Sequence, residues 1–199
     1  MVGGGNDQSY PNGASLLSNY KKVGIINIDA HFDVRPLIDG KTHSGSPFRQ
    51  LLEDTRFDGS QFYEFAAQGN QCSNEHAKYL KEKCSKIVWL KEMNSSSNCS
   101  VKSKFQQVLK DLDSNDSIFV SFDLDSVSSD FAPGVSCPAT IGISSQDALD
   151  ICFLAGSNPK VKLFDLSEFN PLIEDDRTSR LVANMFYYFS MGFTQRKKN

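Results

Sequence analysis

The segment Val23-Gly24-Ile25-Ile26-Asn27-Ile28-Asp29-Ala30-His31-Phe32-Asp33 decides the fold of this chain. Its first six residues form a short, mainly apolar run, which is typical of a parallel strand buried on both faces of a sheet. Asp29, His31 and Asp33 follow at every second position, so they can share one face of an extended chain. Because open parallel sheets bind ligands beyond the carboxyl ends of their strands, this segment predicts a sheet and a site together.

Similar apolar runs alternate with helical patterns along the rest of the chain. We expect further strands at 62–67, 87–90, 117–122 and 161–166. We expect helices at about 47–54, 74–84, 101–112, 146–154 and 176–189, and the first of these has Ser46 as a candidate N-cap and Pro47 at the first helical position. This alternation predicts an α/β fold, a three-layer α/β/α arrangement with a mainly parallel central sheet, in a single domain over residues 1–199.

Composition narrows the function classes. The net charge is −3, and the basic residues form no patch of the kind that binds nucleic acid. No apolar run approaches the length of a membrane span and no leader-like segment opens the chain, so we expect a cytoplasmic protein without a membrane partner. The five cysteines form no CxxC pair, which predicts reduced and mostly buried thiols. For Cys137 the alternative is an exposed thiol that is sensitive to oxidation.

Two other strand ends also carry acidic residues. Asp123-Leu124-Asp125 follows the run at 117–122, and Glu168 follows the run at 161–166. Each piece alone is more often a helix cap or a structural hydrogen-bonding group, but their combination favours a metal site. Converging carboxylates repel one another, and two divalent cations would remove that repulsion. Carboxylates with one imidazole suit manganese better than a thiolate-rich zinc site, although ligand type does not settle the metal.

Six ordered motifs make the sequence resemble the ureohydrolases, the arginase and agmatinase superfamily. They are Gly4-Gly5-Asn6-Asp7, the Asp29–Asp33 segment, His43-Ser44-Gly45, Ser121-Phe122-Asp123-Leu124-Asp125, Ala132-Pro133-Gly134 and Glu168-Phe169-Asn170-Pro171. The segments at 33–36, 43–50 and 65–72 resemble the formimidoylglutamase branch. The resemblance implies an arginase-like fold that hydrolyses N-formimino-L-glutamate to L-glutamate and formamide, a step of histidine degradation, with a hydroxide that bridges two metal ions. Members of this family are longer, so we expect N-terminal elements to be missing here.

The resemblance also implies a ligand set for two Mn²⁺ ions. Asp29 and Asp123 would bridge both ions. One ion would also bind Asp33 and Asn6. The other ion would also bind His31 and Asp125. The family usually has histidine where this chain has Asn6. An amide oxygen is a weaker donor than imidazole, so we expect one ion to bind less tightly.

Three residues outside the ligand set have expected roles. His43 matches the position of a mobile histidine that moves protons near the leaving group, which suits the near-neutral pKa of imidazole. Glu168 would hold the cationic amidine-like end of the substrate. Arg35 is our candidate for a substrate carboxylate, because a guanidinium group binds carboxylates through two hydrogen bonds. The alternative for Arg35 is a structural ion pair.

Two other functions remain open. The first is another ureohydrolase specificity, agmatinase or arginase, which the segments at 33–36 and 43–50 argue against. The second is a truncated, non-catalytic relative that serves as a subunit or binding module. Asn6 and the expected loss of N-terminal elements favour that relative, whereas the intact ligand set opposes it. Family members commonly assemble, so we expect a homo-oligomer.

Overall fold

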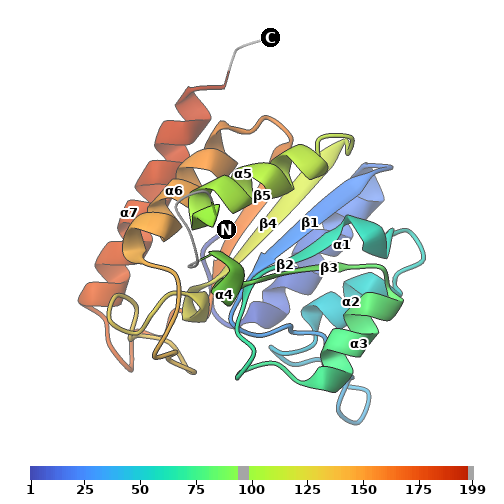
Figure 1. The fold of residues 1–199 in the computed structure, drawn as a ribbon, viewed down its shortest axis with the longest axis horizontal. Helices are drawn as coiled ribbons and strands as arrows, with labels where there is room; N and C mark the ends of the chain where they lie inside the picture. The colour runs from blue at the N-terminus through green and yellow to red at the C-terminus, as the bar shows by residue number, and fades with distance from the viewer. Residues whose placement is uncertain (94–98, 197–199) are drawn as a thin grey trace.

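A five-stranded sheet forms the centre of the computed structural model, which describes residues 1–93 and 99–196. All neighbouring strands pair in parallel, in the order β3-β2-β1-β4-β5 (Figure 1). Their bounds are β1 Val23–Ile28, β2 Phe62–Ala67, β3 Lys86–Trp89, β4 Ser117–Asp123 and β5 Val161–Ser167. Every residue of β1 is buried, as its continuous apolar pattern predicts for a central parallel strand.

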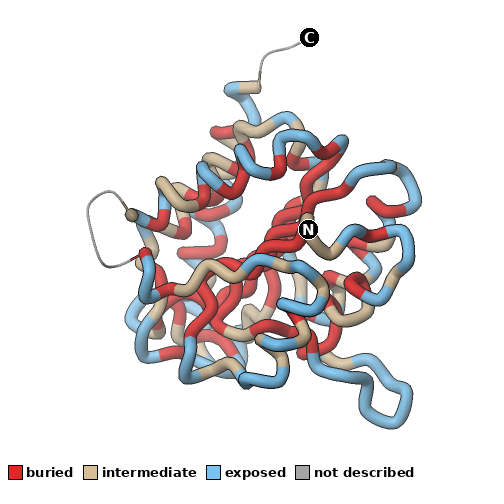
Figure 2. The backbone as a smooth tube through the Cα atoms, turned by 45° about the vertical axis from the view of Figure 1, so that its right-hand side comes forward, coloured by how far each residue is buried: buried red, intermediate tan, exposed pale blue. Residues whose placement is uncertain are grey.

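Helices cover both faces of the sheet, which confirms the three-layer α/β/α prediction (Figure 1). One apolar cluster packs helices α1 (Ser9–Asn19), α2 (Pro47–Glu53) and α3 (Asn74–Glu82) against one face. A larger cluster packs α5 (Val101–Asp111), α6 (Ser145–Ser157) and α7 (Arg177–Thr194) against the other. Figure 2 shows the result as a continuous buried centre between two partly exposed layers. None of the helices that the structure describes is long and apolar enough to cross a membrane.

The strand order also explains where a site can form. The chain adds β2 and β3 on one side of β1, and then crosses back to place β4 and β5 on the other side. The loops that follow β1 and β4 therefore lead to opposite sides of the sheet, because the order in which strands are added reverses between these two strands. A crevice at such a point is the usual ligand site of an open parallel sheet. The two acidic segments predicted from the sequence, at 29–33 and 123–125, follow these two strands.

Helix α1 was not predicted, because Pro11 and Gly13 lower the helical propensity of its first turns. Pro11 lies near the start of the helix, where its missing N–H costs no helical hydrogen bond. At Gly13 a Cβ atom would lie 2.6 Å from Cδ1 of Leu51, so the glycine permits close packing of α1 on α2. Tertiary packing therefore outweighs the local signal.

Other sequence predictions needed smaller corrections. Leu90 begins a short helix, α4 (Leu90–Met93), instead of ending strand β3. Ser46 precedes α2 as predicted, but its hydroxyl bonds to the backbone of His43 and makes no capping bond to the helix. The prediction of mostly buried thiols was wrong, because only Cys152 is buried. Cys137 is exposed, since it lies on a loop beyond the sheet.

Candidate metal centre

Two groups of potential metal-binding side chains meet beyond the ends of β1 and β4. One group is Asp29, His31 and Asp125, and the other is Asp29, Asp33 and Asp123. Within each group the potential ligand atoms lie within 4.8 Å of one another. A 3-10 turn at Leu124–Ser126 follows β4 directly and brings Asp125 toward the segment after β1. Asp29 belongs to both groups, so the arrangement offers two adjacent cation positions with a shared carboxylate.

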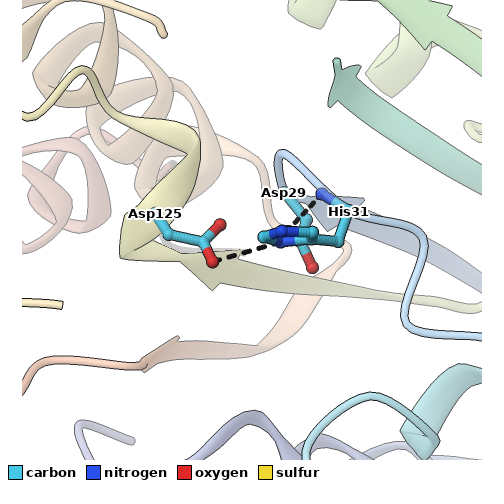
Figure 3. A group of neighbouring side chains, drawn as sticks. All are labelled: Asp29, His31 and Asp125. Carbon is cyan, nitrogen blue, oxygen red and sulfur yellow. Dashed lines mark hydrogen bonds and ion pairs between the residues drawn. The ribbon is translucent and has the colours of Figure 1, made fainter. Parts of the chain in front are cut away.

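The imidazole of His31 lies between two carboxylates (Figure 3). Its Nδ1 atom is 3.2 Å from Oδ2 of Asp125 and 3.3 Å from Oδ1 of Asp29. The backbone N–H of His31 also donates to Oδ1 of Asp29 at 2.7 Å. The carboxylates of Asp125 and Asp29 accept from the ring and raise the pKa of His31 to about 12. Without a metal ion, the histidine thus acts as the local cation.

The aspartates are crowded and buried, which raises the pKa of three of them. Burial is the largest cause for Asp33 and Asp123, and the negative charges of neighbouring aspartates add to it. Burial and the charge of Asp29 raise the pKa of Asp125 to about 7, although His31 acts in the opposite direction. Oδ1 of Asp125 is buried and has no hydrogen-bond partner among the described residues. A divalent cation would relieve the repulsion and use this orphaned acceptor, so the donor set fits such an ion.

Asn6 and Glu168 are hydrogen-bonded to each other, and Asn6 also contacts a candidate ligand. Nδ2 of Asn6 donates to Oδ2 of Asp33 at 2.8 Å, and its backbone N–H donates to Oε1 of Glu168 at 2.8 Å. Oδ1 of Asn6 accepts from the hydroxyls of Ser9 at 2.8 Å and Ser167 at 3.2 Å. The amide therefore presents its nitrogen to the aspartates. To coordinate a metal ion through oxygen, it would turn about its Cβ–Cγ bond.

Two predicted site residues have a left-handed backbone. Asp33 has a φ of 46° and Glu168 a φ of 66°, a region that non-glycine residues adopt rarely. Such a conformation costs on the order of 1–3 kcal/mol, and it is concentrated at functional sites. Glu168 directly follows β5 and Asp33 lies in the loop after β1, and both side chains line the cavity.

Four of the five potential ligands, namely His31, Asp33, Asp123 and Asp125, line a small cavity of about 140 Å³, whereas Asp29 is fully buried and does not line it. Arg35 also lines it, and no ion pair joins Arg35 to a carboxylate in the part of the chain that the structure describes. Sγ of Cys137 lies at the cavity, 3.8 Å from Nε2 of His31. The ring of His43 turns away, with Nε2 3.2 Å from the carbonyl oxygen of Pro36. Three of the sequence-predicted site residues, Asn6, Asp29 and His43, do not line the cavity, but each makes a hydrogen bond with a residue that does.

Sequence reasoning missed two buried residues behind the ligands. Asn27 lies on β1 and Glu64 on β2, and both are fully buried. Nδ2 of Asn27 donates to both carboxylate oxygens of Glu64, at 3.1 and 3.2 Å, and it is 3.3 Å from Oδ2 of Asp29. A polar residue within each of two otherwise apolar strands was the available signal, but their pairing depends on the register between β1 and β2.

Comparison with known proteins gives a consistent result. The sequence pattern of the arginase family matches residues 1–192. The chain is 32% identical over 192 residues to a formimidoylglutamase of Staphylococcus aureus, which covers 95% of this chain and 60% of the relative. It is 46% identical to a crystal structure of Trypanosoma cruzi formiminoglutamase with Mn²⁺, with a TM-score of 0.93 and coverage of 98% of this chain and 65% of that one.

A third similar structure is a formimidoylglutamase from Bacillus subtilis. It has a TM-score of 0.92 at 24% identity, which supports the fold alone. The match covers 99% of this chain and 61% of the Bacillus chain. This chain thus spans less than two thirds of the length of each of these three relatives.

Proposed function

Because this chain belongs to the arginase family, we propose that it is a binuclear manganese hydrolase that cleaves N-formimino-L-glutamate to L-glutamate and formamide. The observation that carries the proposal is the pair of metal-binding groups that share Asp29. The similar proteins named formimidoylglutamase support the substrate. The Mn²⁺ in the Trypanosoma cruzi structure supports the metal.

The proposal gives each ion its own ligands in addition to the shared ones. Asp29 and Asp123 would bridge both positions. One ion would add Asp33 and the amide oxygen of Asn6, and the other would add the remaining two ligands, His31 and Asp125. Bound in this way, the two ions would supply Lewis acidity that activates water at neutral pH. His31 must then lose its proton, so metal binding and proton release are coupled.

The substrate-contacting residues would act on the two ends of the substrate. Glu168 retains an oxygen that is free of the contact with Asn6, and a carboxylate there can accept from the N–H groups of the formimino carbon. Arg35, unpaired by any described carboxylate, would bind a carboxylate of the glutamate portion at the cavity wall. Together these two contacts would hold the reacting carbon over the metal-binding carboxylates.

The hydrolysis breaks the bond between the formimino carbon and the glutamate nitrogen. The oxygen of water becomes the carbonyl oxygen of formamide, and the two protons of water end on the formamide nitrogen and the glutamate amine. His43 would carry a proton to the departing amine, since imidazole exchanges protons near neutral pH. For this role the ring leaves its contact with Pro36 and turns toward the cavity.

The first test measures metal content and formamide release with the purified chain dialysed against Mn²⁺. We expect about two ions per chain and release of formamide from N-formimino-L-glutamate, with little turnover of agmatine or arginine. Asp123→Ala is the matched inactive control, because it removes a carboxylate that both ions would share. Faster turnover of agmatine or arginine than of N-formimino-L-glutamate would show that the proposed substrate is wrong.

The alternative function is a non-catalytic relative that acts as a subunit or binding module. The observation that favours it is the amide of Asn6, which presents its Nδ2 atom, a hydrogen-bond donor and not a metal ligand, to Asp33. A folded, metal-loaded sample without any turnover would select this alternative. A size measurement by light scattering on the same sample would show whether the chain assembles into a homo-oligomer.

A further inference from the structure

One row of buried polar side chains crosses the sheet beneath the candidate ligands. The pairing register places Asn27 opposite Glu64 on one side and opposite Ser121 on the other, and Ser121 opposite Asp165. All four side chains are fully buried. Two residues further along the strands, on the same face, come Asp29, Asp123 and Ser167. The row therefore lies directly below the carboxylates of the proposed metal centre.

Such a row does not serve the stability of the sheet well. A buried carboxylate loses its hydration, and well-packed apolar residues of similar size are often as stable or more stable. Glu64 is an example, because burial and the charge of Asp29 raise the pKa of its carboxyl group far above the usual range. Phe62, which lies two residues before Glu64 on the same face of β2, is fully buried and apolar. An apolar residue at position 64 would therefore be compatible with the surrounding core.

The contacts of Asn27 suggest what the row does. Its Nδ2 atom carries two hydrogens and faces two acceptors, the carboxylate of Glu64 and Oδ2 of Asp29. Reversing the amide would place Oδ1 of Asn27 against both acidic groups, so Glu64 fixes the amide with its N–H toward Asp29. A protonated carboxyl group still offers its carbonyl oxygen, so this contact persists in either charge state of Glu64.

The carboxylate of Asp29 is consequently held at both of its oxygens. Oδ1 accepts the backbone N–H of His31 at 2.7 Å, and Oδ2 faces the amide of Asn27 at 3.3 Å. Asp29 is also the residue that both metal-binding groups share. A change in its orientation would therefore affect both cation positions at once.

We propose that Glu64 and Asn27 are positioning residues for the metal centre: Glu64 orients the amide of Asn27, which in turn holds the shared ligand Asp29. This inference rests on the proposed metal centre and adds a supporting layer to it. Hydrogen-bonding partners behind metal ligands typically change metal affinity by 10- to 100-fold when they are removed. Neither residue touches the cavity, so both act through Asp29.

The test compares Mn²⁺ affinity and thermal unfolding in the unsubstituted chain and three variants. Glu64→Met removes the acceptor but keeps an unbranched side chain of similar length, and Glu64→Gln keeps an acceptor for Asn27. Ile25→Val is the matched core control, since Ile25 lies on β1, on the same face as Asn27 and two residues before it. Mn²⁺ affinity is read from the electron paramagnetic resonance signal of free Mn²⁺ during titration, and unfolding is measured in the presence of a chelator.

We expect Glu64→Met to weaken Mn²⁺ binding by on the order of 10- to 100-fold while the metal-free protein stays folded at the temperature of the titration. Glu64→Gln should restore most of the affinity, and Ile25→Val should leave it unchanged. Unchanged Mn²⁺ affinity in Glu64→Met would overturn the positioning role and leave the metal centre standing. An unsubstituted chain that binds no Mn²⁺ would overturn both.

A second variant covers the case in which Glu64→Met does not fold. The double variant Asn27→Leu with Glu64→Leu replaces the pair by apolar side chains, and it should fold and bind Mn²⁺ as weakly as Glu64→Met. If neither variant folds while Ile25→Val does, the pair is structural and the inference is wrong.

Discussion

The metal-free chain should lose stability as the pH rises from about 4.5 to about 7, which is the reverse of ordinary acid denaturation. The pKa of Asp125 rises from an ordinary 3.8 to about 7 on folding, chiefly through burial. Between these values the folded chain binds more protons than the unfolded chain, so the free energy of unfolding falls with rising pH. This contribution is fully present below pH 3.8 and is lost as the pH passes 7.

The magnitude follows from the size of the shift. One pKa unit corresponds to about 1.4 kcal/mol, so the shift from 3.8 to about 7 removes about 4 kcal/mol in all, of which about 3 kcal/mol is lost between pH 4.5 and 7. Asp125 is only 5% exposed, so solvent screening does not reduce this figure much. Burial raises the pKa of Asp33 and Asp123 as well, which adds to the loss. A loss of this size is a large part of the 5–15 kcal/mol that stabilises a typical domain.

The assay is urea denaturation at several pH values above 4.5, with a chelator present. Surface carboxylates with a lowered pKa, such as Asp54 at about 2, lose their stabilising effect only in more acidic solution. Asp125→Asn should reduce the slope of the free energy of unfolding against pH by about 1.4 kcal/mol per pH unit. Asp175→Asn is the matched control, because Asp175 is exposed and belongs neither to the cavity lining nor to the metal-binding groups. It should leave the slope unchanged.

Adding Mn²⁺ should reverse the pH trend. Metal binding requires deprotonated ligands, so the stabilisation by Mn²⁺ should grow as the pH rises. At a free concentration of 100 times the dissociation constant, one site contributes about 2.7 kcal/mol. The reasoning is refuted if the metal-free chain keeps a flat or rising stability between pH 4.5 and 7, or if Asp125→Asn leaves the slope intact.

Three further predictions concern the cavity. Glu168→Gln should lower kcat/KM by on the order of 10- to 100-fold through loss of a charged hydrogen bond, while the Mn²⁺ content measured by mass spectrometry stays the same; loss of both ions would show that Glu168 is a ligand. Asn6→His should tighten Mn²⁺ binding at one position without changing substrate preference, because imidazole is the stronger donor, and equal titration curves for the two proteins would contradict this. Arg35→Ala should raise KM for N-formimino-L-glutamate about tenfold and Arg35→Lys should restore it only in part, whereas an unchanged KM in the alanine variant would remove Arg35 from substrate binding.

The sequence alone determined the sheet and the positions of the acidic segments. Central parallel strands are buried on both faces, so they appear as continuous apolar runs whose ends are marked by the first polar residues. Asp29 and Asp123 stand at such ends, and His31, Asp33 and Asp125 follow them closely in the sequence. These properties depend only on residues that are close together in the sequence, so the sequence pattern predicts them. The direction of Asp125 was not predicted, because a 3-10 turn at Leu124–Ser126 replaces the extended chain there.

The tertiary structure alone decided which distant groups meet. The Asn27–Glu64 contact depends on the pairing of β1 with β2, and the orientation of Asn6 depends on hydroxyls from α1 and β5. The exposure of Cys137 and the outward turn of the His43 ring are set by loops whose paths no periodicity specifies. Strand order and register bring residues together across long stretches of chain, and a local pattern carries no information about such contacts.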